Sequence, residues 1–343
     1  GIYCRPEGML PDTTKLEEKD VGELLNSLQI DRSSVATGQY AVLFANTATS
    51  HHIGEARMWV TQARLLAQHG IASLRMDIAA LGDSEAAQDP INASTLHNMR
   101  ACADVSEGIN WLVEAGHTRP TLVGICSGAY LCFNATVMNP RAVGAVLINQ
   151  NFYTWSGTEH IAPKLFVAST RVYLASVRRA DKWKRLLSGQ IPVTTIAAML
   201  ARRRLEKWGR QSIDLFSKLR GEESHIGAVQ KKFSMLAQRG VNVSVLYGDF
   251  DAGLEESQTI FGRDFKWLRR LPGMRISIER SLDHGLFLYP ARDRMAAVIK
   301  EHLHEQASGS LNVQAPNTAS FSGFNWKVLG RRRAMLNSVP VKR

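Results

Sequence analysis

A cysteine between two glycines is the residue with the clearest chemical potential in this sequence. The run Gly124–Gly128 reads Gly-Ile-Cys-Ser-Gly and places Cys126 at the centre of a Gly-x-nucleophile-x-Gly pattern. This spacing is typical of a sharp strand-to-helix turn, where bulkier neighbours would collide with the side chain that is lifted above the sheet. At a helix N-terminus, the macrodipole and the free N–H groups favour a thiolate. We therefore predict that Cys126 is a nucleophile, with Ser127 as the weaker alternative.

A nucleophile of this kind requires a base, and the base requires a carboxylate that orients it. Downstream of Cys126, the turn Gly248–Gly253 contains Asp249 and Asp251, and His284 lies in a later turn. Both turns follow predicted strands, and the carboxyl ends of parallel strands meet at one edge of a sheet. We expect His284 to be the base and Asp251 to orient it, with Asp249 as the alternative acid.

An oxyanion that forms during acyl transfer requires backbone N–H donors close to the nucleophile. The residue after the nucleophile supplies one donor in this architecture, and the loop after an early strand supplies the other. We therefore expect the N–H of Ser127 to act together with that of Asn46 or Thr47, in the loop after the predicted strand Tyr40–Ala45.

Two histidines follow in the same loop. His51 and His52 are candidate substrate-binding residues, and the alternative is that they only shape the loop. The residues around them contain too few companion ligands for a metal site. The chemistry expected at Cys126 requires no metal and no organic cofactor.

Short apolar segments alternate with longer amphipathic segments, which predicts βαβ units around a mostly parallel sheet. Strands are expected at Tyr40–Ala45, Ala72–Asp77, Pro120–Gly124, Ala142–Asn149, Val241–Tyr247 and Arg275–Arg280, with one more in Gly1–Pro6. Helices are expected at Glu55–His69, Thr95–Ala115, Ser127–Asn139, Gln258–Leu271 and Ala291–His304. Gly70 and Gly116 follow the first two of these helices, at the position where a glycine commonly ends a helix.

The alternation of strands and helices breaks in residues 151–240, where the sequence is helical in pattern and basic. Residues 155–220 contain 14 Lys and Arg against 4 Asp and Glu. We predict that residues 1–150 and 241–304 form two parts of one α/β core. Residues 151–240 are then a basic helical cap inserted between two strands, and residues 305–343 are a polar and basic C-terminal tail.

Composition narrows the class of protein. The chain has 343 residues, 45% of them hydrophobic and 21% charged, which excludes a mainly disordered or fibrous protein. Its net charge of +11 suggests anionic partners, but we find no nucleic-acid-binding motif. Four irregularly spaced cysteines predict a reducing, cytoplasmic setting, and no apolar run is long enough to cross a membrane. Because the chain starts at Gly1 and not at Met, we expect that it was trimmed upstream.

These motifs together resemble the α/β-hydrolase superfamily. Asp77–Ser84 is similar to its D-x-x-G-x-G-D-S loop after the fourth strand, with Ala80 in place of the first glycine. Leu122–Gly128 is similar to its nucleophile elbow, with Cys where most members have Ser, and dienelactone hydrolase is similar in using a Cys-His-Asp triad. The resemblance implies an α/β-hydrolase fold, in which helices flank a mostly parallel central sheet and residues 151–240 cap the active site.

A narrower resemblance is to bacterial hydrolases found with exosortase and exopolysaccharide gene sets, related to serine aminopeptidase-like members. It rests on Ile125–Ala129, on His52–Gly54 with Arg57–Trp59, and on Trp183–Gly189 in the predicted cap. This resemblance implies a fold and a reaction class, and it says little about the substrate.

The sequence thus predicts a hydrolase of ester or thioester bonds that uses Cys126, His284 and Asp251 and forms an acyl-enzyme intermediate. One alternative is an acyltransferase with the same triad, because a hydroxyl or an amine can intercept a thioester in place of water. Another is a catalytically silent binding protein on the same fold. The expected substrate is a small-molecule or carrier-bound acyl group. The basic cap could bind an acidic protein or an anionic polysaccharide, and no nucleic acid partner is expected.

Overall fold

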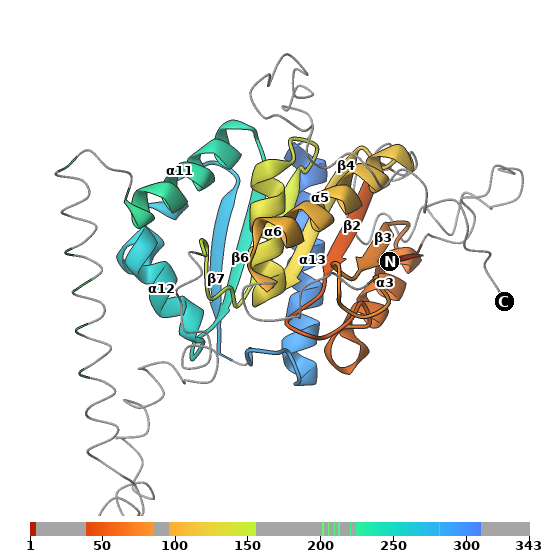
Figure 1. Ribbon diagram of the computed structural model, residues 1–343, viewed down its shortest axis with the longest axis horizontal. Helices are drawn as coiled ribbons and strands as arrows, with labels where there is room; N and C mark the ends of the chain where they lie inside the picture. Colours follow the sequence, from red (N-terminus) through yellow and green to blue (C-terminus); the bar gives the residue numbers. More distant parts are fainter. Residues whose placement is uncertain are drawn as a thin grey trace, which may run out of the picture. The chain divides into compact units, whose positions relative to one another are not determined.

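The computed structural model describes residues 1–4, 39–85, 96–155, 224–280 and 282–309, with positions 201, 205, 209, 212 and 220 between them. Its strands are β1 (Ile2–Cys4), β2 (Tyr40–Ala45), β3 (Ala72–Met76), β4 (Arg119–Ile125), β5 (Gly144–Ile148), β6 (Asn242–Gly248) and β7 (Met274–Glu279). They form one seven-stranded sheet in the order β1-β3-β2-β4-β5-β6-β7 (Figure 1). Only β1 runs antiparallel to its neighbour.

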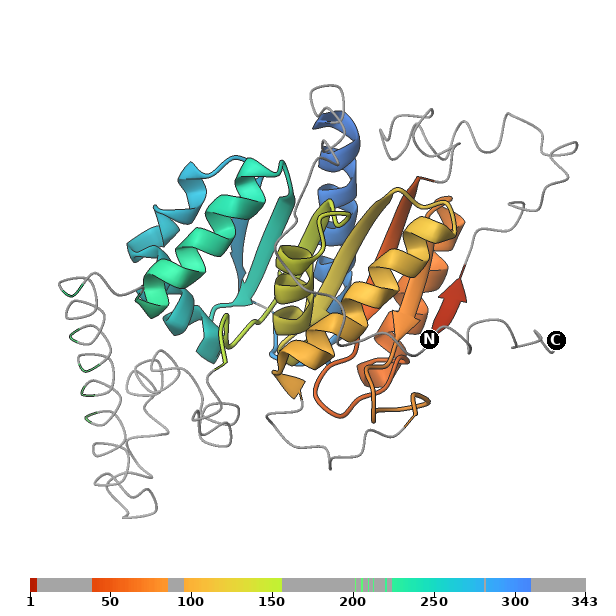
Figure 2. The ribbon, with the colours of Figure 1, turned by 45° about the horizontal axis from the view of Figure 1, so that its top comes forward.

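Helices cover both faces of this sheet. They are η1 (Glu55–Arg57), α3 (Met58–Gln68), α5 (Met99–Glu114), α6 (Ser127–Met138), α11 (His225–Gln238), α12 (Ala252–Phe261), η2 (Arg263–Phe265), η3 (Leu268–Arg270) and α13 (Tyr289–Gly309). Helices α5, α6, α11 and α12 pack on one face, and α3 and α13 pack on the other (Figures 1 and 2). The predicted α/β architecture, a mostly parallel sheet flanked by helices, is confirmed.

Alternation along the strands creates two separate hydrophobic cores. In β2, Leu43 faces the core beneath α5 and α6, whereas Val42 and Phe44 face the core beneath α3 and α13. All three side chains are fully buried. A strand that is apolar on both faces is stable only when both faces are covered. The same pattern made the strands recognisable as short apolar runs in the sequence.

The helix predicted at Gln258–Leu271 is wrong in its position. Helix α12 begins at Ala252, because Asp251 caps it through a hydrogen bond from the Gly253 N–H, and it ends at Phe261. Gly262 has φ of +80°, a left-handed conformation that stops an α-helix. Two short 3₁₀ turns, η2 and η3, then lead to β7.

The other predicted elements hold with small shifts at their ends. Every predicted strand is present, including the one expected in Gly1–Pro6, which is β1. Gly70 and Gly116 have φ of +75° and +100°, as expected for glycines that end helices. Helix α5 begins at Met99 rather than Thr95, because the Asn98 side chain accepts a hydrogen bond from the Ala101 N–H and caps it there.

The predicted cap and tail lie largely outside the described residues. This applies to the helices expected between His160 and Lys218, and to residues 310–343. Within the range assigned to the cap, α11 packs its buried Val229, Phe233 and Leu236 into the same core as α6. Residues 305–309, assigned to the tail, continue α13. In the part of the chain that the structure describes, no helix is long and apolar enough to span a membrane.

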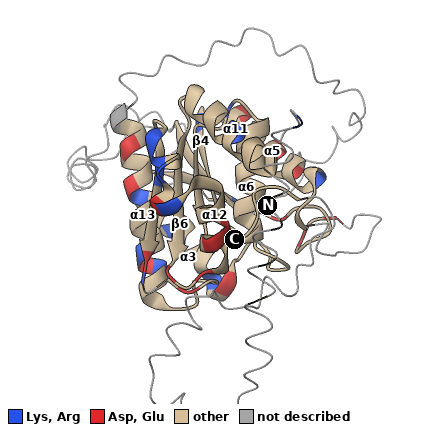
Figure 3. Ribbon diagram, turned by 90° about the vertical axis from the view of Figure 1, so that its left-hand side faces the viewer, with Lys and Arg blue, Asp and Glu red and all other residues tan. Residues whose placement is uncertain are grey.

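Buried polar side chains join α13 to the centre of the sheet. His302 Nδ1 lies 2.8 Å from the Ser244 hydroxyl oxygen, and Thr121 Oγ1 donates to Gln306 Oε1 at 2.8 Å. A Cβ on Gly144 would collide with the side chains of His302 and Gln306, so glycine leaves both side chains in place. Helix α13 carries both acidic and basic residues along its length (Figure 3), whereas its inner side contributes this uncharged network.

Stability is predicted to depend on pH through His302. Burial, together with the nearby positive charge of Arg275, lowers the pKa of His302 from 6.5 to about 3. The unfolded chain therefore binds one more proton than the folded chain between these values, so stability falls as pH drops below about 6.5. We expect His302 to increase the unfolding equilibrium constant by up to about tenfold per pH unit in this range. Urea denaturation between about pH 4 and 7 measures this effect.

A His302→Gln variant is expected to lack this part of the pH dependence. His304→Gln, the same substitution two positions along α13 at a partly exposed residue, is the matched control. If wild type and His302→Gln lose stability in parallel on acidification, His302 is not the group responsible.

Candidate active site

The turn between β4 and α6 is strained at Cys126. β4 ends at Ile125 and α6 begins at Ser127, so Cys126 alone joins the two elements. Its φ of 54° and ψ of −114° fall outside the regions that residues with a side chain favour. The strand–turn–helix arrangement predicted around Cys126 is therefore present.

Close backbone contacts explain both glycines of the motif. A Cβ on Gly124 would overlap the backbone of Gly128. A Cβ on Gly128 would lie 2.7 Å from the carbonyl oxygen of Asn46, closer than real Cβ atoms approach an oxygen. The turn at Cys126 and the loop after β2 are thus in direct backbone contact.

Two hydrogen bonds fasten the loop after β2 to this turn. Thr47 Oγ1 donates to the carbonyl oxygen of Ile125 at 3.2 Å, and the Ala48 N–H donates to Ser127 Oγ at 2.7 Å. The hydroxyl of Ser127, the alternative nucleophile, thereby holds the loop. Asn46 and Thr47 are both buried here. Their N–H groups and that of Ser127, in the first turn of α6, stay the predicted oxyanion donors.

Asp251 holds His284 in place. Its Oδ1 accepts a hydrogen bond from the Gly253 N–H at 2.8 Å, and its Oδ2 lies 2.6 Å from Nδ1 of His284. The Asp251 side chain is almost fully buried, so this carboxylate is shielded from water. The carboxylate of Asp249, the alternative acid, has a buried Oδ1 without a hydrogen-bond partner in the described part of the chain. Of the two candidate acids, Asp251 is the one that contacts His284.

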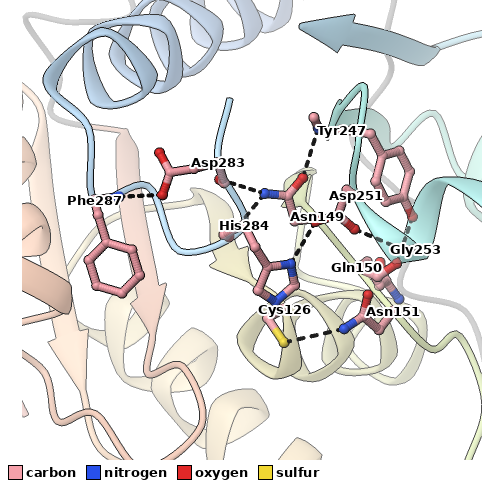
Figure 4. Close-up of polar contacts among 11 residues, drawn as sticks. Cys126, Asn149, Gln150, Asn151, Tyr247, Asp251, Gly253, Asp283, His284 and Phe287 are labelled. Atoms are coloured by element: carbon pink, nitrogen blue, oxygen red, sulfur yellow. Dashed lines mark hydrogen bonds and ion pairs between the residues drawn. The ribbon is translucent and has the colours of Figure 1, made fainter. Parts of the chain in front are cut away.

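The His284 ring lies between a carboxylate and the sulfur. Figure 4 shows one ring nitrogen on the side of Asp251 and the other on the side of Cys126. Burial alone would lower the pKa of His284, but its hydrogen bonds with Asp251 and Cys126 outweigh burial and raise that pKa to about 10. This arrangement favours an imidazolium beside the sulfur at neutral pH.

Two other cysteines, Cys102 and Cys132, are expected to react slowly. Burial raises the pKa of the Cys102 thiol to about 12, and it raises the pKa of Cys132 further. Thiols with such pKa values hold almost no thiolate at neutral pH and react slowly. Cys126 differs from both because an imidazole faces its sulfur.

Sequence reasoning missed the loop after β5, which contacts each part of this site. The Asn149 side chain is fully buried, and its backbone has a φ of 49°. Its Nδ2 donates to the carbonyl oxygens of Asp283 and His284 at 3.1 and 3.0 Å, and its Oδ1 accepts from the Gly248 N–H at 2.9 Å. One amide thus ties the histidine loop to the end of β6. The signal in the sequence was the polar run Asn-Gln-Asn directly after a buried apolar strand.

The next two residues of this loop, Gln150 and Asn151, lie against the turn after Asp251 and against the Cys126 sulfur. The Gln150 carbonyl oxygen accepts a hydrogen bond from the Tyr247 hydroxyl at 2.8 Å, and it would collide with a Cβ on Gly253. Asn151 Nδ2 lies 3.8 Å from the Cys126 sulfur, within the range of a hydrogen bond to sulfur (Figure 4). The loop therefore adjoins Cys126, His284 and the turn of Asp251 together.

His52 is held by the loop that follows β3. Its N–H donates to Asp77 Oδ1 at 2.6 Å, and its ring Nδ1 lies 2.8 Å from Asp77 Oδ2. His52 is buried, whereas His51 is exposed and meets it edge-on. Ala80, which occupies a glycine position of the resembled motif, has φ of +70°. Substrate binding by His51 and His52 stays a prediction.

His52 also belongs to a group with metal-ligating atoms. Together with Asp77 and Asp83 it places one such atom from each residue within 4.8 Å of the others. Asp77 Oδ2 already accepts hydrogen bonds from the His52 ring and from the Asp83 N–H at 3.1 Å. The Asp77 carboxylate thus holds the His52 loop and the Asp83 loop through hydrogen bonds, and we assign no metal to this group.

Comparisons with known proteins find similar solved structures at low sequence identity. No protein-family model and no curated protein matches the sequence. Among solved structures, proline iminopeptidase from Mycobacterium smegmatis is similar, with 15% identity, coverage of 90% of this chain and 95% of that chain, and a TM-score of 0.48. An esterase from Pyrococcus furiosus has 13% identity, 89% and 98% coverage, and a TM-score of 0.48. Dienelactone hydrolase from Anabaena variabilis has 11% identity, 78% and 87% coverage, and a TM-score of 0.42.

Removing the Asn149 amide is expected to destabilise the fold. Asn149→Ala loses three hydrogen bonds and leaves buried backbone groups without a partner, so the free energy of unfolding should fall by about 2–3 kcal/mol. Asn149→Gly loses the same bonds but tolerates the positive φ, so it should retain roughly 1 kcal/mol more than Asn149→Ala. Urea denaturation measures both differences. An Asn149→Ala variant as stable as wild type would show that the amide does not hold the histidine loop.

Proposed function

We propose that this chain is a hydrolase of ester or thioester bonds with Cys126 as nucleophile, His284 as base and Asp251 as the orienting acid. One observation carries the proposal. His284 Nδ1 lies 2.6 Å from Asp251 Oδ2, and the other side of the ring faces the Cys126 sulfur (Figure 4). A sulfur, an imidazole and a buried carboxylate in this order are the components of nucleophilic acyl transfer.

The proposed reaction begins with a thiolate and an imidazolium. The Cys126 sulfur attacks the acyl carbon, the carbonyl π electrons move to oxygen, and a tetrahedral oxyanion forms. When this collapses, the bond to the leaving group breaks, and the His284 imidazolium gives its proton to the departing oxygen or sulfur. An acyl group then remains on Cys126 as a thioester.

Water completes the proposed cycle. His284, now neutral, takes a proton from water as the water oxygen attacks the thioester carbon. The bond between carbon and sulfur then breaks, the electron pair returns to the Cys126 sulfur, and the carboxylic acid is released. Asp251 accepts no proton in these steps, because its part is to hold the Nδ1 side of the ring and to stabilise the imidazolium.

Backbone N–H groups at the turn support the charged intermediate in this proposal. Ser127 lies at the N-terminus of α6, where first-turn N–H groups lack partners within the helix. Asn46 or Thr47 would supply the second donor, since hydrogen bonds fasten their loop to the turn at Cys126. Removing one donor of this kind typically slows an enzyme by about 100- to 1000-fold.

The narrower features of the expected function stay predictions. They are a relationship to the exosortase- and exopolysaccharide-associated hydrolases, a carrier-bound or polysaccharide-linked acyl group, a basic cap that binds an acidic partner, and a cytoplasmic location. A thiolate can attack esters and thioesters alike, so the chemistry of the site favours neither bond.

Acyl-enzyme formation is the direct test. Incubation with p-nitrophenyl esters and acyl thioesters should add one acyl group to Cys126, which mass spectrometry of peptides can locate. Cys126→Ala should give no adduct and no turnover, whereas Cys4→Ser, the matched loss of another thiol, should behave as wild type. Adding hydroxyl or amine acceptors distinguishes transfer from hydrolysis by the product formed. Neither adduct nor turnover across a broad panel would contradict the proposal and favour a binding protein.

The proposed pair of a His284 imidazolium and a Cys126 thiolate predicts how Cys126 reacts at different pH values. Because Asp251 helps to raise the pKa of His284 to about 10, the imidazolium should persist well above neutral pH. Asp251→Asn should lower that pKa and reduce alkylation of Cys126 by iodoacetamide at about pH 7 by about tenfold or more. Asp249→Asn is the matched control and should alkylate at the wild-type rate. Equal loss in both variants would show that Asp251 has no special relation to His284.

A further inference from the structure

The Cys126 sulfur has a second polar neighbour besides His284. Asn151 Nδ2 lies 3.8 Å from it, and Figure 4 shows the amide reaching the sulfur from a different direction than the imidazole. An amide N–H can only donate, so its electrostatic effect on a negatively charged sulfur is attractive. Neither the triad nor the predicted oxyanion donors include this residue.

The position of this amide is unfavourable for stability alone. Asn151 is 7% exposed, and its Oδ1 is buried without a hydrogen bond partner within the described part of the chain. A buried carbonyl oxygen without a partner destabilises a fold, whereas an apolar side chain of the same shape would not. Within the described part of the chain, the hydrogen bond of this side chain is the one that its other end, the N–H group, makes with the sulfur.

Neighbouring residues fix the amide in this position. The preceding residue, Gln150, accepts a hydrogen bond from Tyr247 through its carbonyl oxygen and donates from its side chain to the carbonyl oxygen of Phe152 at 2.8 Å. Asn149 anchors the start of the same loop. A donor that is held in advance needs no rearrangement when charge develops next to it.

We propose that Asn151 is a catalytic residue whose side-chain N–H donates to the Cys126 sulfur and stabilises the thiolate. The role rests on the proposed nucleophilic chemistry but is separate from the triad, because the amide neither gains nor loses a proton. It acts when the thiolate is free, before attack and again when the bond between carbon and sulfur breaks. His284, with Asp251 behind it, is the titratable group that faces the same sulfur.

Alkylation without any substrate tests this role. In a Cys4→Ser background, the rate at which iodoacetamide modifies Cys126 is measured from about pH 5.5 to 9. Asn151→Leu should react more slowly than wild type near pH 6.5, by up to about tenfold. Its stability to urea should equal or exceed that of wild type, because the unpartnered carbonyl oxygen is gone. Asn151→Asp keeps the shape but repels the thiolate, so it should react more slowly still.

Asn134→Leu is the matched control for the loss of a buried amide. The Asn134 amide binds the Tyr130 carbonyl oxygen at 3.0 Å and Lys232 Nζ at 2.8 Å. This variant should lose stability and keep the wild-type alkylation rate, the reverse of Asn151→Leu. Slow alkylation in both variants to the same degree would assign the effect to general loosening and overturn the proposal.

The outcomes separate this proposal from the proposed hydrolase function. Wild-type alkylation profiles in Asn151→Leu and Asn151→Asp would overturn the role of Asn151, even if Cys126 forms acyl adducts. Slow alkylation in these variants, with no acyl adduct from any substrate in wild type, would overturn the hydrolase function and keep the contact between amide and thiolate. If Asn151→Leu does not fold, Asn151→Ala decides the question, because it also removes the donor without adding a charge.

Discussion

The candidate site depends on one close contact between two pieces of backbone. The turn after β4 and the loop after β2 approach so closely at Gly128 and Asn46 that no side chain fits between them. This contact fixes Cys126 at a strained φ of 54° and sets the N-terminus of α6 against the loop that carries Thr47. The proposed nucleophile and the expected oxyanion donors are therefore held together by direct contacts.

The remaining groups reach this unit because the strands are parallel. β5, β6 and β7 follow β4 in the sheet, so the loops at their carboxyl ends gather at the same edge. The loop after β6 supplies Asp251, the loop after β7 supplies His284, and Asn149 joins these two loops from the end of β5. Hydrogen bonds from the Asn149 and Asp251 side chains thus tie three neighbouring loops to one another, as the proposed proton relay requires.

Local sequence patterns predicted those features of the structure that depend on a single segment of the chain. Apolar alternation located the strands, and glycine spacing with strand placement located Cys126, Asp251 and His284. The sequence favoured Asp251 as the partner of the histidine but left Asp249 open, because the choice depends on how far two loops reach through space. The misplaced helix at Gln258–Leu271 has a related cause, since its helical pattern was stronger than the capping signal at Asp251.

The strained conformation of Cys126 sets the stability of the fold against the proposed reactivity of this residue. Glycine would adopt a φ of 54° without strain, but it has no atom that could attack a carbonyl. Stability of the fold alone would favour glycine at this position, whereas the proposed reactivity requires a residue that weakens the fold. A serine or an alanine at position 126 would be strained in the same way, because both have a Cβ. Replacing the sulfur by another atom would therefore leave the backbone strain unchanged.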